Sequence, residues 1–492
     1  MPVPLTQIPD NLLVPGNYQE IDNSLAGSQS DVKRVLVVGI KSVAGVALAN
    51  KAIAISSKDS GNTQLGDGSP AAVMVANMLE LNKTEELWAL PLAENPIGIA
   101  AVKKIAVSID TLQPGIAVRY FAGIKVSIGV SAADTDAIIA TKLLAAVNAA
   151  EGMPGEASID PAHLNEVLWT CKVKGEVGNF NDITAGLFGE TDPAGLTLTV
   201  STVTSGAGNP SLSAALASLG DIRYHFIISD LVDTASLSAW SLDLTDRYSA
   251  TRQIGGRLFL ALSGIAGDAT TVGSMIAQAE NTNNPHIALV SRGKNPQSPA
   301  VWAARIAAVA IRALADDPSA NTQGIAVPGL IATDHHDFDT RQKLLESGVL
   351  TWKVDTIGTV LIERLVTSYT EAASGSRDTS YLDIQVVETV DAIRTHINAE
   401  VARTYKQWKL ASTNENFGSG SRVMTTSVFQ GFLVSLYQQV FIQEKQWCQD
   451  LESYKESLIV EVKAGTKNRL QYQHRPVLIG QFLISAGLNQ FK

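Results

Sequence analysis

The chain has 492 residues, of which 45% are hydrophobic and only 17% charged, and its formal net charge at pH 7 is -10. A chain of this length should hold about two to four domains with substantial cores. The acidic balance argues against nucleic acid as the main partner. The low charge content is typical of a subunit that buries much of its outside against copies of itself.

Residues 1–31 are expected to form an N-terminal arm and linker, because four prolines in the first 15 residues rule out a long helix. One extended strand is predicted at Gly16–Ile21. This segment lacks the basic region and apolar core of a signal peptide, and no window of the chain is apolar for long enough to span a membrane. We therefore expect a protein kept in cytoplasm-like solvent, with Cys171 and Cys448 as unpaired thiols.

Residues 32–95 are predicted to begin an α/β core. Arg34–Ile40 has the unbroken apolar pattern of a buried strand, and Glu86–Leu92 is predicted as the next strand. Between them, Ser69 followed by Pro70 indicates a helix start, with a hydroxyl cap and proline at the first helical position.

Residues 96–205 differ in character and are predicted to form a mainly β insertion domain with a small core of its own. One helix is expected at Asp134–Asn148. Short apolar runs separated by glycine, proline and aspartate predict strands at Lys104–Ile109, Ala117–Arg119, Ile124–Ile128, Glu166–Val173 and Leu196–Val203.

Residues 206–325 return to the α/β core. Strands are predicted at Tyr224–Ser229, Arg257–Leu262 and His286–Ser291, each followed by a helix. Strands that alternate with helices at this spacing predict a doubly wound parallel sheet.

Residues 326–469 are predicted to form an α+β C-terminal domain, and residues 470–492 a C-terminal arm. The domain should contain strands at Leu350–Val354 and Val360–Thr370, a helix opened by the polar loop Ser374–Thr379, and an amphipathic helix from Thr426. In the arm, the apolar run Val477–Ile484 is predicted as a strand whose edge needs a partner.

Three features of the sequence resemble sites of chemistry. Asp334-His335-His336-Asp337 is the metal-like cluster of the sequence, and a solvated loop that caps a helix from Asp339 is the favoured interpretation. Val37–Gly45 fits neither nucleotide-loop pattern, so a tight turn is predicted. No Ser-His-Asp motif of a protease is found in its usual setting. We therefore predict no catalytic, cofactor-binding or metal-binding residue and no enzyme activity.

The order of several motifs resembles the contractile tail sheath proteins of Mu-like bacteriophages. The motifs are I-P-D-N-L-L-V-P-G-N-Y-Q-E-I-D-N-S (Ile8–Ser24), G-V-S-A-A-D-T-D-A-I-I-A (Gly129–Ala140), G-E-V-G-N-F-N-D-I (Gly175–Ile183), G-N-P-S-L-S-A-A-L-A-S-L-G-D (Gly208–Asp221), G-V-L-T-W-K-V-D (Gly348–Asp355), L-I-E-R-L (Leu361–Leu365) and D-T-S-Y-L-D (Asp378–Asp383). Several matches in the same order are far more specific than any one of them.

This resemblance implies a subtilisin-like α/β core and a mechanical role. Subunits would stack as six-fold rings in a helical sheath around the inner tail tube, and would contract to drive the tube through the host envelope for genome ejection. The implied partners are other copies of the chain, the inner tail tube protein, and the baseplate and tail terminator proteins, with no cofactor, no direct contact with nucleic acid and no membrane insertion. The implied location is the virion tail, assembled in the host cytoplasm.

The resemblance also implies that the arms link neighbouring subunits as added strands, with the insertion domain outside and the C-terminal domain facing the tube. The arm residues expected to do so are Tyr18, Gln19, Glu20, Ile21, Val477, Leu478, Ile479, Phe482 and Leu483. Two alternatives stay open at this point: the sheath of a bacteriocin-type contractile injection device, and a metal-dependent phosphoesterase that uses the Asp334-His335-His336-Asp337 cluster.

Overall fold

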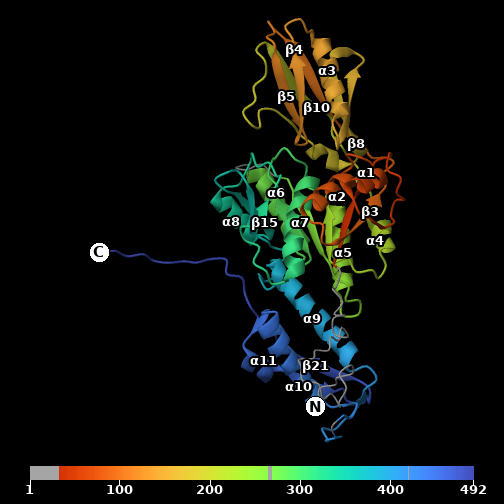
Figure 1. Ribbon diagram of the computed structural model, residues 1–492, viewed down its shortest axis with the longest axis vertical. Coiled ribbons are helices and arrows are strands. Elements are labelled where there is room, and N and C mark those ends of the chain that lie inside the picture. The colour runs from red at the N-terminus through yellow and green to blue at the C-terminus, as the bar shows by residue number, and fades with distance from the viewer. Residues whose placement is uncertain (1–32, 264–268, 419, 492) are drawn as a thin grey trace, which may run out of the picture.

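A nine-stranded mixed sheet forms the centre of the molecule (Figure 1). The structure, a computed structural model, describes residues 33–263, 269–418 and 420–491. The central strands run parallel and are, in spatial order, β15 (Val349–Val354), β13 (Ile287–Ser291), β12 (Arg257–Leu262), β11 (Phe226–Ser229), β1 (Arg34–Ile40) and β3 (Glu86–Leu92).

Both edges of this sheet are antiparallel. β2 (Ile53–Ala54) pairs with β3 on one side, while β16 (Val360–Arg364) and then β14 (Ala326–Val327) follow β15 on the other. β15 and β16 are joined by a short turn, and a turn of this length can connect only antiparallel strands. The expected parallel sheet is thus confirmed for the centre and wrong at the edges.

Helices cover both faces of the central sheet. On one face lie α1 (Lys58–Leu65), α2 (Pro70–Leu81) and α7 (Pro299–Asp316), and on the other α4 (Ser213–Ser218), α5 (Thr234–Tyr248), α6 (Ala269–Thr282) and α8 (Phe338–Glu346). The side chains of β1 alternate between the two hydrophobic clusters, with Val35 and Val37 in one and Leu36 and Val38 in the other. Burial on both faces explains the unbroken apolar sequence of this strand.

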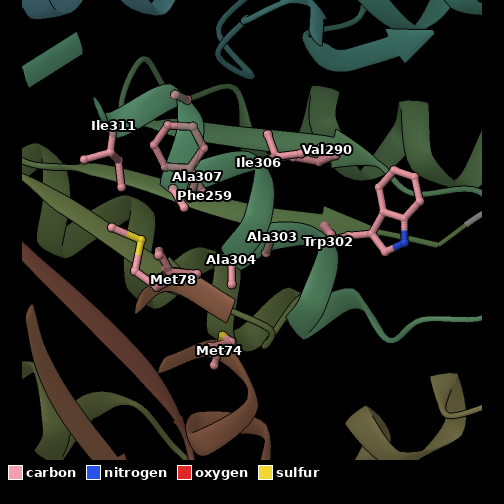
Figure 2. Packing of buried hydrophobic residues seen from close by; sticks show 14 of the residues in the cluster. Met74, Met78, Phe259, Val290, Trp302, Ala303, Ala304, Ile306, Ala307 and Ile311 are labelled. Atoms are coloured by element: carbon pink, nitrogen blue, oxygen red, sulfur yellow. The ribbon is translucent and has the colours of Figure 1, made fainter. Parts of the chain in front are cut away.

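Small residues let α2 approach its neighbours closely. Figure 2 shows Met74 and Met78 of α2 near Ala304 of α7, and all three side chains are at most 1% exposed. A Cβ atom added to Gly39 of β1 would lie 2.6 Å from the Met74 methyl carbon. Gly39 is therefore a packing position, where a larger residue would push α2 away from the sheet.

The segment between β3 and α4 builds a separate β-rich body at one end of the molecule (Figure 1). Its core includes Trp169 and Phe121, and its helix is α3 (Asp136–Ala149). One sheet has the order β10 (Leu196–Thr204), β4 (Ala100–Ile109), β8 (His163–Lys174), β7 (Gly155–Asp160), and the other the order β6 (Ile124–Val130), β5 (Gly115–Phe121), β9 (Ile183–Thr184).

Two local expectations for this body need correction. The α3 helix begins two residues later than expected, because the Thr135 hydroxyl accepts a hydrogen bond from the Ile138 N–H and so caps the helix there. β7 was not expected at all, since its half-polar edge-strand sequence has no apolar run. Ile99 and Ala207 form a bridge where the chain enters and leaves the body.

The C-terminal part forms a third body, joined to the sheet by the long helix α9 (Ile384–Thr404) (Figure 1). It contains α10 (Thr426–Leu436), which continues as a π-helix at Tyr437–Glu444, and α11 (Leu451–Ser457). Its short strands pair as β17 (Lys409–Leu410) with β18 (Val423–Met424), β19 (Cys448–Gln449) with β22 (Val477–Leu478), and β20 (Ile459–Val462) with β21 (Leu470–Gln473).

Two predicted strands are shorter in the structure. The strand expected at Val360–Thr370 ends at Arg364, because Thr367 and Ser368 donate their backbone N–H groups to Leu382 and Ile287 instead. The strand expected at Val477–Ile484 ends at Leu478, which lies opposite Cys448, the first residue of its antiparallel partner β19. Among the described helices, none is long and apolar enough to cross a lipid bilayer.

Candidate assembly surfaces and the buried joint

Helix α9 is shared between the central sheet body and the C-terminal body. Ile384, in its first turn, belongs to the hydrophobic cluster of the sheet, whereas Ile393 and Ile397 belong to the cluster of the C-terminal body. A helix that is buried in two cores at once forms a joint between them. The polar contacts around it decide how rigid that joint is.

Arg257, at the amino end of β12, holds the first two turns of α9. Its side chain is 0% exposed, and its Nε atom lies 2.8 Å from Oε1 of Glu388. The same guanidinium donates hydrogen bonds to the carbonyl oxygens of Gly256 (2.9 Å) and Val387 (3.1 Å). A buried charge needs this degree of pairing, because an isolated one would cost several kcal/mol.

Asp391 extends the network one turn further along α9. Its carboxylate lies 2.5 Å from a guanidinium nitrogen of Arg223, 2.5 Å from one of Arg394 and 3.9 Å from one of Arg257. Asp391 is 2% exposed. Charges from α9 and from two segments of the sheet body therefore meet around one carboxylate.

Aromatic rings pack against this charged network. The Tyr248 ring lies under the Arg394 guanidinium at 4.4 Å and 4.5 Å from the His286 ring. Burial, reinforced by the neighbouring Arg257, lowers the pKa of His286 to about 2, so this imidazole is neutral. Burial raises the pKa of Glu388, and Arg257 opposes that rise.

Sequence reasoning missed this joint because it followed only the apolar residues of the helix. The available signal was the spacing of Glu388, Asp391 and Arg394, which places three charges on one side of α9. The partner Arg257 lies more than a hundred positions away, and no local pattern connects the two.

A second contact zone lies where the loop after α7 meets the C-terminal body. Trp447 donates its indole N–H to Asp317 (3.1 Å), and the Gln481 amide donates to the carbonyl of Ser319 (3.0 Å). The Asn321 amide donates to the carbonyl of Phe482 (3.1 Å). The start of the tail is thus held against the body of its own chain.

The predicted arm residues fall into three groups. Tyr18, Gln19, Glu20 and Ile21 lie outside the described residues. Val477 and Leu478 form β22 and pair with Gln449 and Cys448 of their own chain, while the Ile479 N–H bonds to the carbonyl of Trp447 at 3.0 Å. Phe482 and Leu483 follow this paired region, with Phe482 77% exposed and Leu483 half-buried.

The tail beyond Leu483 leaves the body altogether (Figure 1). It carries Ile484, Leu488 and Phe491, which are 79%, 83% and 96% exposed. Large apolar side chains that gather in one extended exposed segment indicate a surface that another molecule covers.

The Asp334-His335-His336-Asp337 loop is mainly structural. The Asp334 carboxylate accepts a hydrogen bond from the Lys294 N–H (2.8 Å), and the buried Asn295 side chain bonds to the loop backbone. Asp337 caps α8 through the Thr340 N–H (2.8 Å). The expectation that this loop caps the following helix is therefore confirmed, with Asp337 as the cap. It is wrong in two details, because the helix begins at Phe338 and His336 is only 3% exposed.

The predicted turn at Val37–Gly45 is confirmed. The Gly45 N–H bonds to the carbonyl of Ser42 (3.1 Å), and a Cβ atom at Gly45 would lie 2.5 Å from the Leu65 backbone. Gly45 therefore allows the turn to pack closely against the Leu65 backbone.

A different trio brings three potential metal ligands together among the described residues. Asp160, His163 and Glu166 lie around the β7–β8 turn, with ligand atoms within 4.8 Å of one another. Glu166 already pairs with Lys104 at 3.0 Å, and His163 is 63% exposed. An ion pair at this exposed turn explains the arrangement without a metal.

Comparison with known proteins places the chain in a family. Residues 205–368 match the profile of the phage tail sheath protein central domain. Over 496 residues the chain is 31% identical to the Mu-like prophage FluMu tail sheath protein of Haemophilus influenzae, with 100% of both chains covered. The chain belongs to the phage tail sheath family.

Solved sheath structures are similar at lower identity. The sheath tail protein of Desulfitobacterium hafniense is 11% identical, with 95% of this chain and 100% of that chain covered and a TM-score of 0.48. The sheath tail protein of Listeria innocua is 12% identical, with coverages of 91% and 95% and a TM-score of 0.44. A chain of the contracted anti-feeding prophage baseplate is 12% identical, with coverages of 97% and 98% and a TM-score of 0.45.

This sheath protein is a structural component of a contractile phage tail and not an enzyme, as the sequence analysis predicted. Its place is the virion tail. The phosphoesterase alternative is discarded.

Proposed function

We propose that this sheath protein polymerises as six-fold rings around the inner tail tube, in the host cytoplasm, and that strand exchange through its two arms links neighbouring subunits. The observation that carries the proposal is the exposed apolar tail beyond Leu483. Such a tail is unfavourable in water and becomes favourable when a neighbour covers it.

The C-terminal body supplies edges that an added strand could pair with. The β19–β22 and β20–β21 sheets have two strands each among the described residues, so each strand has an outer edge open to pairing. An extended segment that joins such an edge gains main-chain hydrogen bonds along its length. The predicted strand at Tyr18–Ile21 and the C-terminal arm, from Ile479 through the exposed tail beyond Leu483, are the proposed donors.

The domain layout follows from the same proposal. The insertion, residues 96–205, would lie on the outer surface. The boundary predicted at residue 325 is too early, because β14, β15 and β16 belong to the central sheet. The central sheet body, which includes residues up to β16, would form a subtilisin-like core, and the C-terminal body beyond α9 would face the tube. Contraction would then shift subunits relative to one another, powered by the assembly energy summed over many copies.

The test changes the tail without touching the bodies. The double variant Ile484→Asp/Leu488→Asp should lose polymerisation, because two charges replace the apolar side chains that a neighbour would bury. The matched control Ser485→Asp/Asn489→Asp adds the same charge at adjacent positions. Polymers are followed by sedimentation and negative-stain microscopy, and monomer folding by circular dichroism.

Polymers in the control and soluble, folded monomers in the apolar-site variant would support the proposal. Long tubes from both variants would show that the tail does not link the subunits.

A further inference from the structure

Asp230 lies at the position in the central sheet where the order of strands reverses. The chain goes from β1 to β3 on one side and, after the insertion, returns to β11 on the other side of β1. Asp230 follows β11 directly, at its carboxyl end. In open α/β sheets this point leaves a crevice between the two connections. In this chain the insertion covers the crevice.

The Asp230 side chain is buried without a partner for one of its oxygens. The residue is 5% exposed, and Oδ1 has no hydrogen-bond partner. It borders a cavity of about 20 Å³, which has room for about one water molecule. The cavity walls come from the core and from the insertion, and include Pro70, Val73, Pro299, Pro154, Val177 and Phe180.

No other side chain that lines this cavity, among the described residues, is titratable. The charged groups nearby on the packed elements are already paired. Asp182 of the insertion lies 2.7 Å from Lys103 and 4.0 Å from Arg292 of the core. Lys172 of the insertion donates to the carbonyl of Asp67, whose carboxylate accepts the Gly152 N–H.

Two opposing effects act on the Asp230 carboxyl. Burial raises its pKa to about 7. The N-terminal ends of α2 and α7 border the same cavity, and the positive ends of their helix dipoles favour the ionised form. Burial is the larger effect, and the carboxyl still titrates within an accessible range.

We propose that Asp230 makes the seam between the core and the insertion sensitive to protonation: the neutral acid fits the closed seam, and the ionised acid opens the seam to water. This inference goes beyond the sheath function and does not depend on the arms. It follows from a buried carboxyl with one oxygen unpartnered, in a mainly apolar cavity that two bodies share and that Asn181 and Ser298 also line.

The direction of the pH effect follows from the raised pKa. Because the folded chain holds this proton more tightly than the unfolded chain, the stabilisation is complete below the ordinary aspartate pKa of about 3.9. It is lost as pH rises through about 7. The seam should therefore be tightest in mild acid and loosest above neutral pH.

Hydrogen exchange of the full-length chain tests this directly. Segments 151–156 and 176–182, on the insertion side of the seam, are compared at about pH 5 and about pH 9, on either side of the Asp230 pKa and after correction for intrinsic rates. Protection in the unaltered chain should fall at the higher pH. In Asp230→Asn, which mimics the neutral acid, it should stay high at both. The control Asp59→Asn changes an exposed carboxylate and should behave like the unaltered chain.

A second measurement does not require the variant to be fully native. Infrared difference spectra between about pH 5 and about pH 9 should show the C=O band of a buried protonated acid, and Asp230→Asn should remove it. Equal pH dependence of exchange in the unaltered chain and in Asp230→Asn, or infrared difference spectra that are identical in the two proteins, would overturn the proposal.

Discussion

Arg257 and Glu388 show what a single buried pair does in this protein. Each would be costly to bury alone, and together they fix α9 to the amino end of β12. Removing one partner leaves the other charge in a region from which water is excluded. Most of the stability lost when either residue is substituted should therefore come from the charge left unpaired, and less from the lost contact.

We predict that Arg257→Met lowers the free energy of unfolding by about 3–5 kcal/mol, because Glu388 is left unpaired. The matched change Arg252→Met should cost only about 0–1 kcal/mol, since its partners Asp221 and Asp246 are exposed. Urea unfolding of the monomer, kept monomeric by the tail substitutions above, measures both.

Adding Glu388→Leu to Arg257→Met should recover much of the lost stability by removing the stranded carboxylate. If the two single arginine variants lose the same stability, the joint is not held by this pair.

Helix starts differ in ways that the sequence does not reveal. Ser69-Pro70 and Ser298-Pro299 look alike in the sequence, so the same hydroxyl cap is expected at both. In the structure the Ser69 hydroxyl accepts from the Ala72 N–H at 3.2 Å, whereas Ser298 makes no side-chain cap bond. The backbone before each helix decides which hydroxyl can reach its N–H group.

Ser69→Ala should therefore lower the free energy of unfolding by about 1 kcal/mol, the usual value of a lost N-cap. Ser298→Ala should cost a few tenths of that, because no cap bond is lost. Paired urea titrations of the two variants decide the point, and equal losses would mean that Ser298 caps α7 in solution.

The helix from Thr426 also differs from its sequence prediction. Its apolar spacing predicted one regular helix through Phe441, but the helix becomes a π-helix at Tyr437. The Tyr437 ring stacks on Tyr454 of α11 at 3.7 Å, and its hydroxyl donates to the carbonyl of Gln449. A contact with a later element thus accompanies the change in helical pitch.

At the scale of the molecule, the three bodies are joined by few connections. The insertion leaves and returns through the Ile99–Ala207 bridge, so it can be removed at one place. Its links to the core include Val173 and Val177, which pack in a core cluster, the hydrogen bonds of Lys172 and Gly152 to Asp67, and the cavity at Asp230.

We predict that replacing residues 100–206 with a short Gly/Ser linker leaves a folded α/β core that still assembles. The core should lose some stability, because Val173 and Val177 no longer cover it. Circular dichroism and microscopy check folding and assembly, and the isolated segment should fold separately. An insoluble deletion together with an unfolded segment would contradict this division.

The sequence by itself determined the elements of the core and the family. Buried strands such as Arg34–Ile40 and helix starts such as Ser69-Pro70 depend on residues within one or two turns of each other, so local patterns suffice to predict them. The order of motifs indicated a tail sheath protein, and the full-length relative confirmed it. The layout of arms and domains stays a prediction.

Tertiary structure alone decided which polar groups meet. It paired Arg257 with Glu388, buried His336 in a loop expected to be solvated, left one oxygen of Asp230 without a partner, and joined Val477 to its own chain. The physical reason is that desolvation and pairing depend on elements that lie far apart in the sequence. Local periodicity carries no information about them, so the joint and the seam could be found only once the bodies were placed together.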